Sequence, residues 1–298
     1  MISPVQRRPI PLVAVAHGSR DPRASATVEA LLDQVRLARP GLPVRVAYLD
    51  HSRPSLAEAL AGLDEAVVLP LLLTEAYHSR VDIPSALGEV RAARPWLRVH
   101  QGSTLGPHPL LISAMERRLA EAGVEIGDPG TAVVLVSAGS SDQRANAVIA
   151  RLARTWARTR PWHSVTPAYA SAASPTPAAA VHTLLNPDPG PNLGPDLGPD
   201  LGPDLGFGGP HTAPLPEAHP HLTTHHLPDG RPSRVVVAPY LLAPGHFADK
   251  VRHTTLTAGA QTTAAPLGPA PELAALLLAR YTESVQAFQT TTTASAST

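Results

Sequence analysis

Two histidines and one carboxylate follow the ends of apolar segments that are typical of buried strands. His17 comes directly after residues 12–16, Asp50 follows a second such segment, and His78 follows a third. A single histidine is more often structural, but two imidazoles and a carboxylate can bind a borderline divalent ion without a thiolate. Neutral imidazoles also accept protons near neutral pH. The three residues therefore indicate chemistry in which a metal ion is delivered while protons leave.

The composition excludes several other kinds of chemistry. The 298 residues include no cysteine, which rules out disulfides, thiolate metal sites and cysteine nucleophiles. Lys plus Arg equals Asp plus Glu at 24 each, and aromatic residues make up 4%, which argues against a nucleic-acid or anionic membrane partner. No apolar run approaches the roughly 20 residues needed to span a bilayer. The first apolar stretch lacks a signal-peptide cleavage pattern, so we expect a cytoplasmic protein.

The segments that carry these residues are repeated along the chain. Parts of the first half recur in the second, in the pairs 13–24 with 134–145, 47–50 with 168–171, and 70–78 with 239–246. The first two pairs share an offset of 121 residues, and the third needs a larger one because a low-complexity insertion intervenes. Two homologous lobes, residues 1–127 and 128–289, are the simplest interpretation.

The insertion, at about residues 186–232, repeats Leu-Gly-Pro-Asp three times and then becomes rich in histidine. Its density of proline and glycine predicts disorder, and we expect the tail, residues 290–298, to be disordered too. Five histidines of the insertion lie within a span of 16 residues, namely His211, His219, His221, His225 and His226. They are either a transient metal-loading segment or the product of compositional drift.

Each half alternates strands and helices, which predicts an α/β protein with doubly wound parallel sheets. In the first half we expect strands at 12–16, 44–49, 66–73 and 97–101, and helices that start near Asp21 and at 56–63, 84–93 and 109–122. A final helix, 271–288, should bury Leu273, Leu276, Leu277 and Tyr281. Ligands gather at the carboxyl ends of parallel strands, where His17, Asp50 and His78 all lie. We therefore expect one site at that edge of the first sheet.

Two motifs make this pattern more specific: Val15-Ala16-His17-Gly18-Ser19-Arg20, and Pro70-Leu71-Leu72-Leu73 followed by His78 and Asp82-Ile83-Pro84. They resemble motifs of the sirohydrochlorin chelatase family, the class II chelatases related to the anaerobic cobalt chelatases. The duplication is similar to the long, two-half form of that family. The resemblance implies two chelatase-like lobes that face a central cleft, in a protein expected to be a monomer.

The same resemblance implies an activity and its reactants. A chelatase of this family inserts ferrous iron or cobalt, without ATP, into the tetrapyrrole sirohydrochlorin for siroheme or cobalamin synthesis. The metal is then a substrate, nickel being a further candidate, and no organic cofactor is expected. His17 and His78 correspond to the catalytic histidines of the family and Asp50 to its carboxylate, and all three are candidate metal ligands.

The chain departs from the family pattern near two of these residues. The family often has glutamate where this chain has Asp50, so the carboxylate is one methylene shorter. The segment before His78 contains Glu75, where Pro-Gly-Gly is common. Glu75 is either an additional ligand or a solvent-facing or capping residue.

The carboxylates of a macrocycle need polar partners, and four residues near the site could supply them: Ser19, Arg20, Arg53 and Arg80. Ser19 lies either in a tight turn whose amides cap the next helix or at a helix N-terminus that attracts these carboxylates. Each arginine, taken alone, is more often simply solvated.

The second half keeps only part of the site. Ala138 stands at the position of His17 and Ser171 at the position of Asp50, whereas His246 matches His78. The second lobe should therefore lack a complete site and close the cleft instead. His246 either faces the macrocycle as a substrate-binding residue or is a structural remnant.

Two other classes of function compete with the chelatase. A non-enzymatic metal or tetrapyrrole carrier would use the same cleft without turnover. Two histidines and a carboxylate in one lobe favour catalysis, because a carrier needs no proton acceptor beside the ring. A hydrolase using Ser19 or Ser140 is disfavoured, since neither serine lies in a Gly-x-Ser-x-Gly turn.

Overall fold

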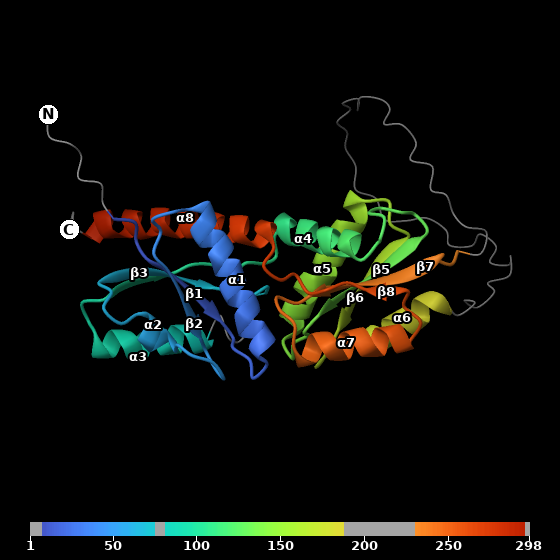
Figure 1. The fold of residues 1–298 in the computed structure, drawn as a ribbon, viewed down its shortest axis with the longest axis horizontal. Helices are drawn as coiled ribbons and strands as arrows, with labels where there is room; N and C mark the ends of the chain where they lie inside the picture. The colour runs from blue at the N-terminus through green and yellow to red at the C-terminus, as the bar shows by residue number, and fades with distance from the viewer. Residues whose placement is uncertain (1–7, 75–80, 188–229, 296–298) are drawn as a thin grey trace, which may run out of the picture.

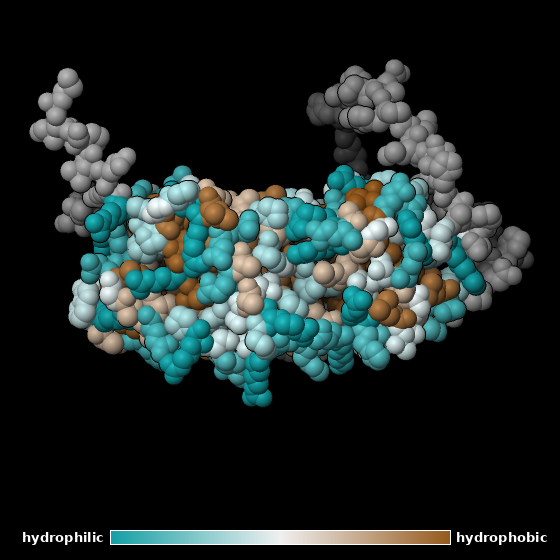
Figure 2. Space-filling view, viewed as in Figure 1, coloured by the Kyte–Doolittle hydropathy of each residue, from teal (hydrophilic) through white to brown (hydrophobic). Residues whose placement is uncertain are grey.

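The computed structural model describes residues 8–74, 81–187 and 230–295 (Figure 1). His78 and Arg80 lie outside these ranges, as do Glu75, nearly all of the insertion with its histidines, and residues 296–298. Within the ranges, no helix combines the length and apolar character that crossing a bilayer requires. Figure 2 shows polar side chains over most of one face, with apolar residues in small, scattered patches.

Two four-stranded sheets form the two lobes. The first contains β1 (Leu12–Ala16), β2 (Val44–Tyr48), β3 (Glu65–Pro70) and β4 (Arg98–Gln101), in the order β2-β1-β3-β4. The second contains β5 (Thr131–Ser137), β6 (Ser164–Tyr169), β7 (Arg234–Tyr240) and β8 (Thr262–Thr263), in the order β6-β5-β7-β8. All pairings are parallel. The identical order confirms the predicted α/β repeat, and β1, β3, β5 and β7 are apolar because helices cover both faces.

Helices alternate with the strands along most of the chain, and one further helix follows the last strand. They are α1 (Pro22–Ala38), α2 (Leu56–Ala59), α3 (Ile83–Ala93), α4 (Pro109–Glu121), α5 (Gln143–Thr159), α6 (Pro177–Leu185), α7 (His246–Thr257) and α8 (Pro271–Ser295). The predicted start of α1 is confirmed, since the carboxylate of Asp21 accepts a hydrogen bond from the backbone N–H of Arg23 at 2.9 Å and Pro22 follows directly.

Three elements differ from the expected bounds by more than one residue. The strand predicted to reach residue 73 ends at Pro70, and the following residues leave the sheet. The helix predicted at 56–63 covers one turn only, because the chain turns at Gly62 with φ of 70°. The last helix continues past residue 288 to Ser295, so part of the tail predicted as disordered is helical. This segment contains neither proline nor glycine to stop the helix.

The two lobes exchange their covering helices. In Figure 1, α8 runs along the first lobe, where it packs on α1 and β3, although it is the last element of the chain. The hydroxyl of Tyr281 in α8 donates a hydrogen bond to the carbonyl of Ile10 at 2.6 Å. Conversely, α4 belongs to the first half in sequence but packs against β7 of the second lobe. One apolar core therefore runs through both lobes, and the expected boundary at residue 127 separates the sheets but not their helices.

Glu116 fastens α4 to the second lobe. Its carboxylate accepts hydrogen bonds from Trp156 Nε1 at 3.0 Å and from the guanidinium of Arg160 at 3.1 Å, and 12% of its side chain is exposed. Trp156 itself is fully buried. The interaction links the two halves of the sequence inside the shared core.

We expect Glu116→Ala to lower the free energy of unfolding by about 2 kcal/mol, because it leaves a buried indole N–H without an acceptor. Urea unfolding followed by circular dichroism measures this. Glu121→Ala is the matched control: its carboxylate also pairs with arginines on α4, but 46% of its side chain is exposed. Exposed ion pairs contribute at most about 1 kcal/mol. Equal losses in both variants would show that Glu116 does not fasten the helix.

Candidate functional site

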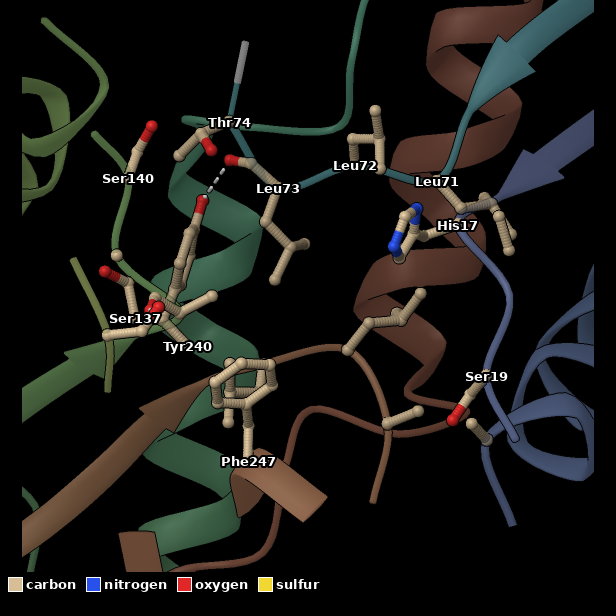
Figure 3. Close-up of a pocket in the computed structure, with 18 of the residues that line it drawn as sticks. His17, Ser19, Leu71, Leu72, Leu73, Thr74, Ser137, Ser140, Tyr240 and Phe247 are labelled. Atoms are coloured by element: carbon tan, nitrogen blue, oxygen red, sulfur yellow. Dashed lines mark hydrogen bonds between the residues drawn. The ribbon is translucent and has the colours of Figure 1, made fainter. Parts of the chain in front are cut away.

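A cavity of about 590 Å³ lies between the lobes. It is formed by the carboxyl ends of β1, β3, β5 and β7 and by the first turns of α1, α5 and α7 (Figure 3). Carboxyl ends of parallel strands are where α/β proteins bind ligands, and the volume lies in the usual range for small-molecule sites. The central cleft that the resemblance implied is thus present.

His17 extends from the end of β1 and lines this cavity with an exposed side chain (Figure 3). Its backbone is held by the end of β2, since the N–H of Asp50 donates to the carbonyl of His17 at 2.9 Å. Gly18 follows with φ of 95°, and a Cβ at this position would overlap the carbonyl oxygen of Asp50. Only glycine permits this close approach, so the sequence His-Gly fixes where the imidazole emerges.

The second lobe repeats this turn without the imidazole. The N–H of Ser171 donates to the carbonyl of Ala138 at 2.9 Å, and Gly139 has φ of 84° beside the carbonyl of Ser171. The geometry of the first turn is therefore conserved between the lobes while its chemistry is not. Among the described residues that line the cavity, His17 is the only histidine, and none is a carboxylate.

The backbone of Asp50 is hydrogen-bonded to that of His17, but the carboxylate of Asp50 contacts His51. One carboxylate oxygen accepts from the backbone N–H of His51 at 2.7 Å, and the other lies 3.2 Å from Nε2 of His51. Asp50 does not line the cavity. Consistent with this, the described part of the chain holds no group of three His, Asp or Glu residues placed to bind a metal ion.

The candidate substrate-binding residues are distributed unevenly. Ser19 lines the cavity, although its Oγ accepts the backbone N–H of Asp21 at 3.0 Å. Arg20 is exposed outside the cavity lining, and Arg53 pairs with Glu58 at the surface. The remaining arginine of the set, Arg80, lies outside the described residues.

His246 begins α7 and is exposed outside the cavity lining, and its ring packs against Phe247 at 6.0 Å between centroids. Phe247 contributes to the cavity wall instead (Figure 3). The repeat aligns His246 with His78, but a sequence match gives no information on which of two adjacent side chains, His246 or Phe247, faces the cavity.

Sequence reasoning also missed Tyr240, at the end of β7. Its ring lines the cavity and is 2% exposed, and its hydroxyl donates to the carbonyl of Leu73 at 2.9 Å (Figure 3). Burial raises the pKa of Tyr240, so the phenol stays protonated and keeps this bond. The bond holds Leu73 and Thr74 of the first lobe against the second. A tyrosine inside an apolar strand is indistinguishable from a core residue in sequence, so no signal pointed to it.

The model of the CbiX family matches residues 11–122 and 132–189, which correspond to the two halves. The chain is 29% identical over 153 residues to a sirohydrochlorin cobaltochelatase of Priestia megaterium, covering 49% of this chain and 50% of the relative. It is 27% identical over 170 residues to a sirohydrochlorin ferrochelatase of Bacillus subtilis, covering 55% of this chain and 64% of the relative. Each match thus spans less than two thirds of the relative's length.

Solved structures share the whole fold. SirB from Bacillus subtilis, solved with Fe3+, superposes with a TM-score of 0.68 at 21% identity and covers 93% of this chain and 95% of SirB. The likeness extends across both lobes and shows that their arrangement is common to the two proteins. With the family model matching both halves, the chain belongs to the CbiX family.

Proposed function

We propose that this protein inserts a divalent metal ion, ferrous iron or cobalt, into sirohydrochlorin without ATP. The observation that carries the proposal is the position of His17, an imidazole at the carboxyl end of β1 that faces a cavity between the lobes. The names of the relatives, which are sirohydrochlorin cobaltochelatases and ferrochelatases, support the same reaction.

Metal insertion releases two protons, because the ion replaces the hydrogens of two pyrrole N–H groups. A neutral imidazole can ligate the arriving ion, or it can accept the two protons one after the other and pass each to solvent. We assign His17 one of these roles and His78 the other. Residues 71–74 line the cavity, and His78 follows Thr74 by four positions in the sequence. By its resemblance to the family, we expect the chain to bring both histidines into one site.

The remaining wall suits the flat, apolar face of a macrocycle. Leu72, Ile149, Leu242 and Phe247 supply apolar surface from both lobes. Burying that surface against the ring favours binding and excludes water from the metal as it exchanges ligands. Serine residues also line the cavity, and their hydroxyls can contact polar groups at the periphery of the ring.

We retain Asp50 as a metal-binding residue, because its backbone is hydrogen-bonded to that of His17. To reach an ion beside His17, the carboxylate must leave His51. Asp50→Asn is then expected to raise the KM for the metal about tenfold, as loss of a ligand or of a supporting partner does. Steady-state rates at varied metal and saturating sirohydrochlorin measure this. An unchanged KM for the metal in Asp50→Asn would remove Asp50 from the site.

The experiment that tests the proposal uses the purified full chain under anaerobic conditions. Sirohydrochlorin and Fe2+ or Co2+ are mixed without ATP, and the absorbance change of metal insertion is followed with and without protein. The expected result is acceleration that is first order in protein. Equal rates with and without protein for every first-row divalent ion would overturn the proposal, and tight binding without acceleration would favour a carrier.

A further inference from the structure

Ser137 is the last residue of β5 and lies in the cavity wall opposite His17 (Figure 3). It is 6% exposed, and its Oγ is buried with no hydrogen-bond partner in the part of the chain that the structure describes. Buried hydroxyls without partners are uncommon in native proteins, and each calls for an explanation. The equivalent residue of the first lobe is Ala16, so the fold itself does not require a hydroxyl here.

Three other polar side chains of this wall, those of Ser140, Asn146 and Ser171, already form hydrogen bonds within the protein. Oγ of Ser140 accepts the N–H of Asp142 at 3.0 Å, and Oγ of Ser171 donates to the carbonyl of Ala138 at 2.9 Å. The side-chain amide of Asn146 both donates to the carbonyl and accepts from the N–H of Ser140. Their hydrogen bonds explain why these residues are polar. Within the described ranges, Ser137 has no such hydrogen bond to explain its hydroxyl.

We propose that Ser137 is a specificity-determining residue that donates a hydrogen bond to a side-chain carboxylate of the bound macrocycle. This inference rests on the proposed function. A serine hydroxyl can turn toward the cavity by a change of χ1 alone. No carboxylate among the described lining residues would repel an anionic group there. Ser137 thus orients the ring from the second lobe while His17 acts on it from the first.

The direct test is Ser137→Ala, with binding of metal-free sirohydrochlorin followed by absorbance and insertion followed by steady-state kinetics. Loss of a hydrogen bond to a charged group is expected to raise both Kd and KM for sirohydrochlorin about tenfold. The kcat should change by less than threefold, because Ser137 does not touch the metal or the ring nitrogens. The thermal midpoint should stay the same or rise, since no protein hydrogen bond is lost.

Ser171→Ala is the matched control, a serine of the same wall whose hydroxyl already has a partner. It should raise Kd for sirohydrochlorin less than Ser137→Ala does. A second ligand, in which the macrocycle carboxylates are converted to neutral carboxamides, identifies the acceptor. With this ligand, Ser137→Ala should raise Kd only about threefold, because hydrogen bonds to neutral groups are weaker.

The two proposals fail in different ways. If the unaltered protein neither binds sirohydrochlorin nor accelerates insertion, the proposed function is wrong. If the unaltered protein does both and Ser137→Ala binds sirohydrochlorin within twofold of it, the role of Ser137 is wrong and the proposed function stands. A lower thermal midpoint together with unchanged Kd would show that Ser137 is structural.

Discussion

Replacing His17 with alanine is expected to lower kcat/KM for metal insertion at least about 100-fold, the usual loss when a group that ligates or moves protons in the reaction is removed. His17 is the only histidine among the described residues of the cavity wall, so no described side chain there can substitute for it. Steady-state rates with sirohydrochlorin and Fe2+ or Co2+ give the loss. Binding of metal-free sirohydrochlorin should change little, which separates chemistry from affinity.

Two histidines of α7 are the controls for this prediction. His246 matches His78 in the repeat but lies outside the cavity lining, and His253 is exposed further along the same helix. His246→Ala should lower kcat/KM for metal insertion less than tenfold, and His253→Ala should leave it unchanged. If His246→Ala loses as much activity as His17→Ala, the second lobe shares in the chemistry and the site is not confined to the first. Full activity in His17→Ala would reject the proposed role of His17.

Replacing Gly18 with alanine is expected to lower the free energy of unfolding by about 3 kcal/mol, the upper end of ordinary substitutions. Two costs combine. An L-residue at φ of 95° is strained, and the new Cβ overlaps the backbone carbonyl of Asp50. That carbonyl accepts a hydrogen bond from the N–H of Ser52 at 2.7 Å, and the N–H of Asp50 pairs with the carbonyl of His17 at the strand ends, so the peptide cannot move freely. Because this pairing also positions His17, kcat/KM should fall about 100-fold, as misplacing a catalytic group by about 1 Å does. Urea unfolding and insertion rates measure the two effects.

Gly41→Ala separates the two costs. Gly41 has φ of 87°, close to that of Gly18, but a Cβ there meets nothing within 4 Å. Only the backbone strain remains, roughly 1–2 kcal/mol, and activity should be unaffected because Gly41 lies in the loop before β2, outside the cavity lining. If Gly18→Ala is no more destabilising than Gly41→Ala, the close approach of the two strand ends is not a constraint.

Much of the fold could be predicted because its signals are local. The N-cap at Asp21, the stripe Val28, Leu31, Leu32 and Val35 that α1 buries, and the apolar β1 each depend on residues adjacent in sequence. The repeat then extended these assignments to the second lobe. The edge at which His17 lies followed from strand direction alone, since parallel strands end together.

Other features depend on contacts that sequence periodicity does not encode. The stripe Leu273, Leu276, Leu277 and Tyr281 is buried as predicted, but periodicity identifies the buried face of α8 and not the lobe that covers it. Likewise, the strand pattern predicts that Asp50 follows the end of β2. It does not predict that the carboxylate of Asp50 pairs with His51, because that contact depends on the conformation of the turn. The choice of Phe247 over His246 at the cavity wall depends on how α7 is rotated.

The exchange of α4 and α8 has a consequence for how the two sheets stay together. Each half of the sequence carries a helix that is complementary to the other half, so neither can bury its own apolar surface alone. Since one chain holds both, each helix meets its receptor surface at the high effective concentration of an intramolecular contact, whatever the amount of protein in solution. The distance between the cavity walls is therefore set within a single chain and does not change on dilution. A site formed between two separate molecules would come apart on dilution.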